Sequence, residues 1–155
     1  MSFMAEYQNN MDSKGRVIVP VKFREALGGK FVVNKGADGN LCLYPMKVWK
    51  HLSDKVSKLS ITNTDARTYK RYFLGSAVEM EIDNQDRITI PQNLRTYAHL
   101  EKEILFIGVG HYIEIWPKTS FEDSSESVAM YQNATSASID VNFDDFDDYD
   151  ESDDI

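Results

Sequence analysis

Two short charged segments stand out because each combines an acid and an arginine four positions apart. The first is MDSKGRVIVP at residues 11–20, which contains Asp12, Lys14 and Arg16. An aspartate in such a place can accept hydrogen bonds from turn amides and can pair with the arginine. An arginine can also grip a planar partner through two parallel hydrogen bonds. The segment is therefore either a self-contained turn or a contact surface.

The same pattern recurs 71 residues later, in IDNQDRITIPQNLRTYA at residues 82–98. The alignment with residues 11–27 pairs Asp12 with Asp83, Arg16 with Arg87, Pro20 with Pro91 and Arg24 with Arg95. It continues downstream at an offset of 72, where LCLYPMKVW matches IEIWPKTSF. The chain thus contains an internal duplication of about 45 residues.

Recurrence favours a contact surface, because a turn that satisfies only its own backbone need not repeat with the same acid, arginines and proline. A β-hairpin or β-ribbon is narrow enough to enter the major groove of DNA, where arginine binds guanine O6 and N7. We therefore expect Arg16 and Arg87 to contact bases. The residues expected to hold phosphates are Lys14, Lys22, Arg24 and Arg95.

The charge of the chain divides sharply along its length. All 17 Lys and Arg lie before residue 119, whereas 12 of the 25 Asp and Glu lie in residues 119–155. The net charge of −8 therefore combines a body of +4 with a tail of −12, and a basic body suits a nucleic-acid partner. Low hydrophobicity and like charge predict disorder over residues 124–155. This acidic, aromatic tail either aids solubility or competes with DNA for the basic body.

Each copy has the pattern of a strand, a tight connection, a short β-branched strand, a helix started by proline, two further strands and a second helix. A unit this small buries too little surface to fold alone, so we expect the copies to interleave around one core. The predicted fold is α+β and mainly β, a pseudo-symmetric swapped-hairpin β-barrel whose closure removes strand edges. We predict a first domain over 6–48, a helical linker over 49–76, a second domain over 77–120 and the acidic tail.

Other functional classes lack the residues that they need. Cys42 is the single cysteine, and His51, His99 and His111 are far apart, so we predict no metal and no cofactor. We see no serine or cysteine nucleophile beside a histidine base and no phosphate-binding glycine loop, which predicts a protein that is not an enzyme and has no small-molecule substrate. The lack of a membrane-length apolar run or signal peptide predicts a cytoplasmic protein.

The motifs together resemble one known family, the MraZ family of bacterial transcription factors. The blocks that carry the resemblance over residues 3–122 are the repeated D-x-x-x-R-[VI]-x-[IV]-P, AEYQNNMD, LCLYPMKVW, DARTYKRYFLGSAVEMEID and LEKEILFIGVGHYIEIW. The resemblance implies tandem SpoVT-AbrB domains, self-association into a ring, and nucleoid binding at repeated boxes upstream of the division and cell-wall gene cluster. Such proteins typically repress that promoter. The family's DNA-contacting motif falls on residues 12–16 and 83–87, here named the first tip and the second tip.

The second tip departs from the family pattern, because Asp86 occupies the position matching Gly15, where the family usually has glycine. Charged residues sum to +1 in the first tip and to −1 in the second. We therefore expect the first tip to dominate DNA binding. Two alternatives stay open: an oligomeric ring scaffold that does not bind DNA, and an antitoxin-like protein of the AbrB type.

Overall fold

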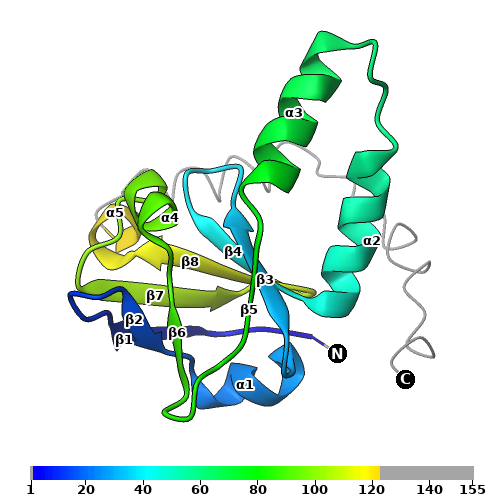
Figure 1. The fold of residues 1–155 in the computed structure, drawn as a ribbon. Helices are drawn as coiled ribbons and strands as arrows, with labels where there is room; N and C mark the ends of the chain where they lie inside the picture. Colours follow the sequence, from blue (N-terminus) through cyan, green and yellow to red (C-terminus); the bar gives the residue numbers. More distant parts are fainter. Residues whose placement is uncertain (1, 123–155) are drawn as a thin grey trace, which may run out of the picture. The chain divides into compact units, whose positions relative to one another are not determined.

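The computed structural model describes residues 2–122 (Figure 1). Its elements in chain order are β1 (Glu6–Asn10), β2 (Arg16–Ile18), α1 (Val21–Leu27), β3 (Phe31–Lys35), β4 (Leu41–Pro45), α2 (Met46–Ser57), α3 (Thr64–Gly75), β5 (Val78–Met80), β6 (Arg87–Thr89), α4 (Gln92–Tyr97), β7 (Glu103–Gly108), β8 (Ile113–Pro117) and α5 (Lys118–Glu122). The strands and helices α1–α4 belong to one compact unit, Met1–Thr119. The tail predicted over 124–155 lies outside the described residues.

The two copies exchange strands, as predicted. One sheet has the strand order β1-β7-β8-β4-β3-β5, and its neighbours are antiparallel. The first strand of each copy lies beside the third strand of the other, β1 with β7 and β5 with β3, while β4 and β8 join the copies at the centre. The remaining strands, β2 and β6, pair as a two-stranded ribbon. The α+β class and the shared core are therefore confirmed.

The prediction of a closed barrel is wrong. Strands β1 and β5 are the edges of the larger sheet, and among the described strands β2 and β6 pair only with each other. The chain diverges at each tip, because the strand before the tip joins the larger sheet while the strand after it joins the ribbon. A side-chain bond from Asn9 Nδ2 to the Ile18 carbonyl, at 2.6 Å, links β1 to β2 in place of a backbone ladder.

One face of the ribbon is part of the core. Val17 and Ile88 lie opposite each other in the β2–β6 register, and each is 1% exposed. They pack in one cluster with side chains of the larger sheet and with Phe23 of α1 and Leu94 of α4. Because neighbouring residues of a strand point to opposite sides, burial of these two leaves the other face of the ribbon open to solvent.

Prolines and a glycine set the helix bounds near the ribbon. Pro20 and Pro91 precede α1 and α4 with φ of −52° and −56°, values suited to helix entry. Gly28, at φ 81°, ends α1 as the Gly28-Gly29 pair predicts. The two copies thus place α1 and α4 in equivalent positions beside the ribbon.

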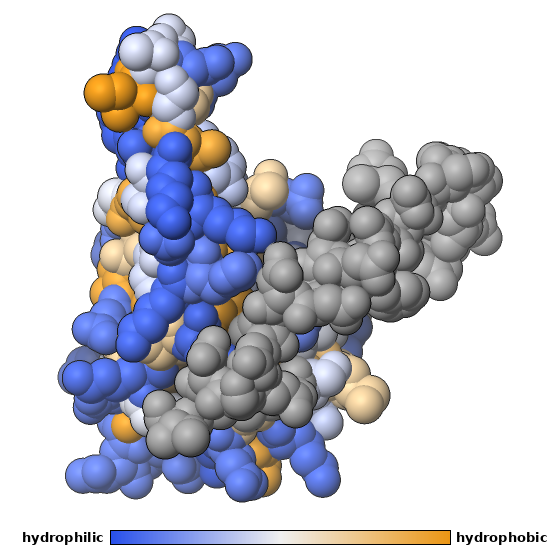
Figure 2. All heavy atoms as spheres, turned by 90° about the vertical axis from the view of Figure 1, so that its right-hand side faces the viewer, coloured by the Kyte–Doolittle hydropathy of each residue, from blue (hydrophilic) through white to orange (hydrophobic). Residues whose placement is uncertain are grey.

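A helical hairpin of α2 and α3 projects from the larger sheet (Figure 1). Asn63 caps α3, since its Oδ1 accepts a 3.1 Å hydrogen bond from the Ala66 N–H. The helices pack through stacking of Trp49 on Phe73, with ring centroids 5.3 Å apart. Leu59 and Ile61 stay exposed at the end of the hairpin, where Figure 2 shows apolar side chains. Within residues 2–122, no helix has the length and apolar character needed to span a bilayer.

Candidate nucleic-acid interface

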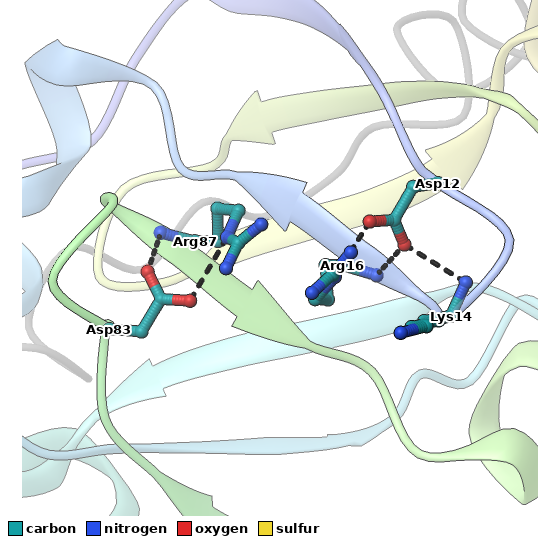
Figure 3. Close-up of polar contacts among 5 residues, drawn as sticks. All are labelled: Asp12, Lys14, Arg16, Asp83 and Arg87. Carbon is teal, nitrogen blue, oxygen red and sulfur yellow. Dashed lines mark hydrogen bonds and ion pairs between the residues drawn. The ribbon is translucent and has the colours of Figure 1, made fainter.

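Asp12 organises the first tip (Figure 3). Its Oδ1 accepts hydrogen bonds from the backbone N–H groups of Lys14 at 3.0 Å and Arg16 at 2.9 Å, and its Oδ2 accepts one from Arg16 Nε at 2.7 Å. The chain reverses at Gly15, whose φ of 82° is the left-handed value that glycine adopts without strain. One carboxylate therefore fixes both the loop and the orientation of the arginine.

Asp83 builds the second tip in the same way (Figure 3). Its Oδ1 accepts hydrogen bonds from the N–H groups of Gln85 at 2.8 Å and Arg87 at 2.9 Å, and its Oδ2 accepts one from Arg87 Nε at 3.0 Å. Asp86 takes the position of Gly15, with φ 63°. The repeated acid and arginine thus produce a repeated geometry.

These hydrogen bonds lower the pKa of both carboxyl groups below the ordinary value of 3.8. The largest cause for Asp12 is the backbone N–H of Arg16, and for Asp83 it is the backbone N–H of Arg87. Because the folded pKa lies below the unfolded one, the ionised carboxylates stabilise the tips above the unfolded pKa. That contribution is lost as the pH falls through the folded pKa.

We predict that an NMR titration of the side-chain carboxyl carbons gives midpoints for Asp12 and Asp83 below pH 3.8. Arg16→Ala should leave part of the lowering of the Asp12 pKa, since its largest cause is the hydrogen bond from the backbone amide of residue 16. A return of the Asp12 midpoint to 3.8 in Arg16→Ala would show that the side chain, and not the amide, holds the carboxylate.

The two tip arginines lie on one exposed face of the ribbon. Arg16 is opposite Thr89 and Arg87 is opposite Ile18, so these four side chains share the face away from the core. Arg16 and Arg87 lie diagonally across the two paired strands, a position in which the backbones of the two residues are about 7–8 Å apart. The tips themselves lie at opposite ends of the ribbon, because the strands are antiparallel. The sequence interpretation missed Ile18 and Thr89, although the alternation that buries Val17 and Ile88 also exposes them.

The guanidinium groups of Arg16 and Arg87 are held in a way that leaves their outer edge available. Each uses Nε to bond its aspartate, and the side chains are 34% and 25% exposed. The Nη atoms donate no hydrogen bond to the rest of residues 2–122. Two adjacent N–H donors on a fixed, partly exposed arginine match the paired acceptors O6 and N7 of guanine.

Because the copies exchange strands, the basic residues expected to hold phosphates do not all lie at the tip of their own copy. Lys14 is exposed at the first tip and Lys22 on α1. Arg24 bonds the Val19 carbonyl through Nε at 2.8 Å and pairs with Asp86 of the second tip, Nη1 to Oδ2, at 3.1 Å. Arg95 bonds the Ile90 carbonyl through Nε at 2.9 Å, beside Gly15 of the first tip. Each copy thus supplies an arginine to the tip of the other copy.

Comparison with known proteins agrees with this tandem design. A family model described as MraZ protein, antitoxin-like, matches residues 2–72 and again residues 73–143. A protein named transcriptional regulator MraZ from Caldanaerobacter subterraneus subsp. tengcongensis is 49% identical over 124 residues, which cover 80% of this chain and 87% of the relative. Its namesake from Halothermothrix orenii is 48% identical over 134 residues, covering 82% and 94%. The one from Pelotomaculum thermopropionicum is 45% identical over 141 residues, covering 90% and 97%. The chain therefore belongs to the MraZ family.

Proposed function

We propose that this protein is a sequence-specific, DNA-binding transcriptional regulator that meets DNA with the exposed face of the β2–β6 ribbon. The observation that carries the proposal is the pair of arginines, Arg16 and Arg87, each anchored through Nε on one solvent-facing surface. The names of the relatives, transcriptional regulator MraZ, support the same function.

In this proposal the ribbon enters the major groove and each tip arginine reads a guanine. A bidentate contact of this kind discriminates against a wrong base by about 1–3 kcal/mol. Asp12 and Asp83 do not touch DNA as attractive groups; they position the arginines and so reduce the conformational freedom lost on binding. Lys14 and Arg95 hold phosphates at the first tip and set the register.

We further propose that the regulator represses the division and cell-wall gene cluster from repeated boxes in its own promoter, on the nucleoid in the cytoplasm and without a cofactor. A homo-oligomeric ring would present several ribbons to several boxes. Tethered contacts of modest strength then gain overall affinity through effective concentration.

The apolar end of the α2–α3 hairpin supports self-association, because Leu59 and Ile61 are 39% and 72% exposed. Within the described residues, a pocket of about 540 Å³ beside α3 adds further apolar surface, lined in part by Tyr44, Tyr69 and Tyr112. We expect Ile61→Glu to lower the mass measured by analytical ultracentrifugation while leaving the far-UV circular dichroism unchanged. A mass equal to that of the wild type would exclude the hairpin end from the subunit contact.

Nuclease protection of the region upstream of the protein's own gene tests the DNA-binding proposal. We expect protection at repeated boxes and repression of a reporter placed behind that region. Equal binding to a shuffled fragment at the same salt concentration would contradict sequence recognition. A ring scaffold predicts no protection at all, and an antitoxin-like protein predicts a toxin partner that copurifies with it.

A further inference from the structure

The two ends of the β2–β6 ribbon differ, and the difference centres on residue 86. We propose that Asp86 holds Arg24 away from DNA phosphates, so that the ribbon engages DNA mainly through the end that contains Gly15 and Arg95. A pseudo-symmetric ribbon with unequal ends binds each site in one orientation. This inference rests on the proposed DNA-binding function and adds a residue that sets the direction of binding.

Arg24 and Arg95 are a matched pair, which isolates the effect of residue 86. They occupy equivalent positions in α1 and α4, and their Nε atoms donate to equivalent carbonyls, Val19 at 2.8 Å and Ile90 at 2.9 Å. The neighbouring backbone is also equivalent, since the Val19 N–H donates to the Asp86 carbonyl and the Ile90 N–H to the Gly15 carbonyl, both at 2.9 Å. Around these two arginines the difference is the side chain of residue 86, which residue 15 lacks; elsewhere the tips also differ at Lys14, which matches Gln85.

That side chain changes what the outer nitrogens of the arginine meet. Nη1 of Arg24 lies 3.1 Å from Oδ2 of Asp86, and the two side chains are 27% and 54% exposed. At the other end there is no side chain on Gly15; a Cβ there would lie 2.6 Å from Arg95 Nε. Asp12 and Glu101 line a shallow pocket with Arg95, yet Arg95 forms no ion pair within residues 2–122. Its Nη atoms are therefore available to a phosphate.

The charge of the two ends follows from this exchange. At the first end, Asp12, Lys14, Arg16 and Arg95 sum to +2. At the second end, Asp83, Asp86, Arg87 and Arg24 sum to zero. The second tip is thus neutral once Arg24 is counted, and not repulsive as the count over the tip alone suggested. Among these eight residues the first end exceeds the second end by two positive charges, which favours phosphates at the first end.

A double-mutant cycle on the full chain tests whether Asp86 acts through Arg24. We expect Asp86→Gly to steepen the salt dependence of binding to the upstream fragment by about 0.9 in log–log slope, the value of one phosphate contact. Its gain in affinity should therefore be about threefold larger at 50 mM than at 200 mM salt. In an Arg24→Ala background, Asp86→Gly should leave the slope unchanged. The same steepening in both backgrounds would overturn the inference, because Asp86 would then act through its own charge.

Single arginine variants supply the matched control. Arg95→Ala should reduce the slope by about 0.9, whereas Arg24→Ala in the presence of Asp86 should barely change it. Equal reductions by the two variants would also overturn the inference. Thermal melts of each variant confirm that it is folded before it is titrated. Failure of the wild-type chain to bind the upstream fragment is a separate outcome, and it would contradict the proposed function itself.

Orientation can be read directly by cleavage from a tethered iron chelate on a fragment with a single box. Gln92→Cys and Val21→Cys mark equivalent, exposed positions at the starts of α4 and α1, near the first and second tips. Cys42 is buried, and burial raises its pKa to about 12, so the label reacts with the introduced thiol. We expect cleavage from residue 92 on one side of the box. Asp86→Gly, which releases Arg24 from its ion pair and raises the second end from zero to +1, should add cleavage on the other side of the box. Cleavage on both sides with the native tips, or a one-sided pattern that persists in Asp86→Gly, would overturn the inference.

Discussion

Arg16→Ala is expected to weaken binding to the upstream region roughly fivefold to 150-fold, corresponding to the loss of about 1–3 kcal/mol from one bidentate contact with guanine. The fold should survive, because Asp12 keeps its bonds to the backbone N–H groups of Lys14 and Arg16. The measurement is a fluorescence anisotropy titration at fixed salt concentration.

Arg87→Ala is the matched comparison, since Arg87 has the same anchoring bonds on the same face. We expect a clearly smaller loss for Arg87→Ala, because the second end lacks the surplus charge that brings DNA close. Both variants should keep the wild-type melting temperature and oligomer mass. Equal losses of affinity in two folded, assembled variants would contradict the dominance of the first tip.

Gly15→Ala is expected to impair both the tip and DNA binding. The backbone at Gly15 has φ 82°, which costs a residue with a side chain about 1–2 kcal/mol. The added Cβ would also lie 2.6 Å from Arg95 Nε and 2.9 Å from the Ile90 carbonyl, so the guanidinium must move. We expect a lower melting temperature and an affinity loss larger than tenfold, measured by calorimetry and by anisotropy titration.

Gly39→Ala separates these two effects. Gly39 also has φ 82°, but no atom lies within 4 Å of the added Cβ, and the residue is in the β3–β4 loop. Gly39→Ala should lower the melting temperature through backbone strain alone and leave DNA affinity unchanged. If Gly15→Ala loses no more stability and no more DNA affinity than Gly39→Ala, the packing of Arg95 against the first tip does not contribute to DNA binding.

The duplicated pattern made the strand exchange predictable, because a copy that cannot bury its own core must borrow strands from the other. Whether the sheet closes into a barrel could not be predicted from the same pattern. The segment EYQNN at residues 6–10 does not say which of the two edges of its strand receives a backbone partner. The pairing depends on the direction in which the chain leaves each tip. At the first tip this direction is accompanied by the hydrogen bond from Asn9 to the Ile18 carbonyl.

At the site, the acid and arginine four positions apart were enough to predict a paired tip, since both belong to one turn. The ion-pair partner of Arg24 could not be predicted in this way. Proximity along the chain associates Arg24 with the first tip, whereas strand exchange brings it to Asp86, which is 62 positions away. A residue whose partner lies in the other copy is invisible to local patterns. The domain bounds of 6–48, 49–76 and 77–120 stay a prediction.

The exchange of strands between copies also shapes how the chain is made. Glu6 lies opposite Ile107, so β1 has no backbone partner until β7 has been synthesised. At bacterial and eukaryotic elongation speeds of about 5–20 residues per second, this delay is about 5–20 s. During that interval the nascent first copy carries apolar strands without a finished core. Protection of the emerging chain from aggregation is thus a requirement built into the topology.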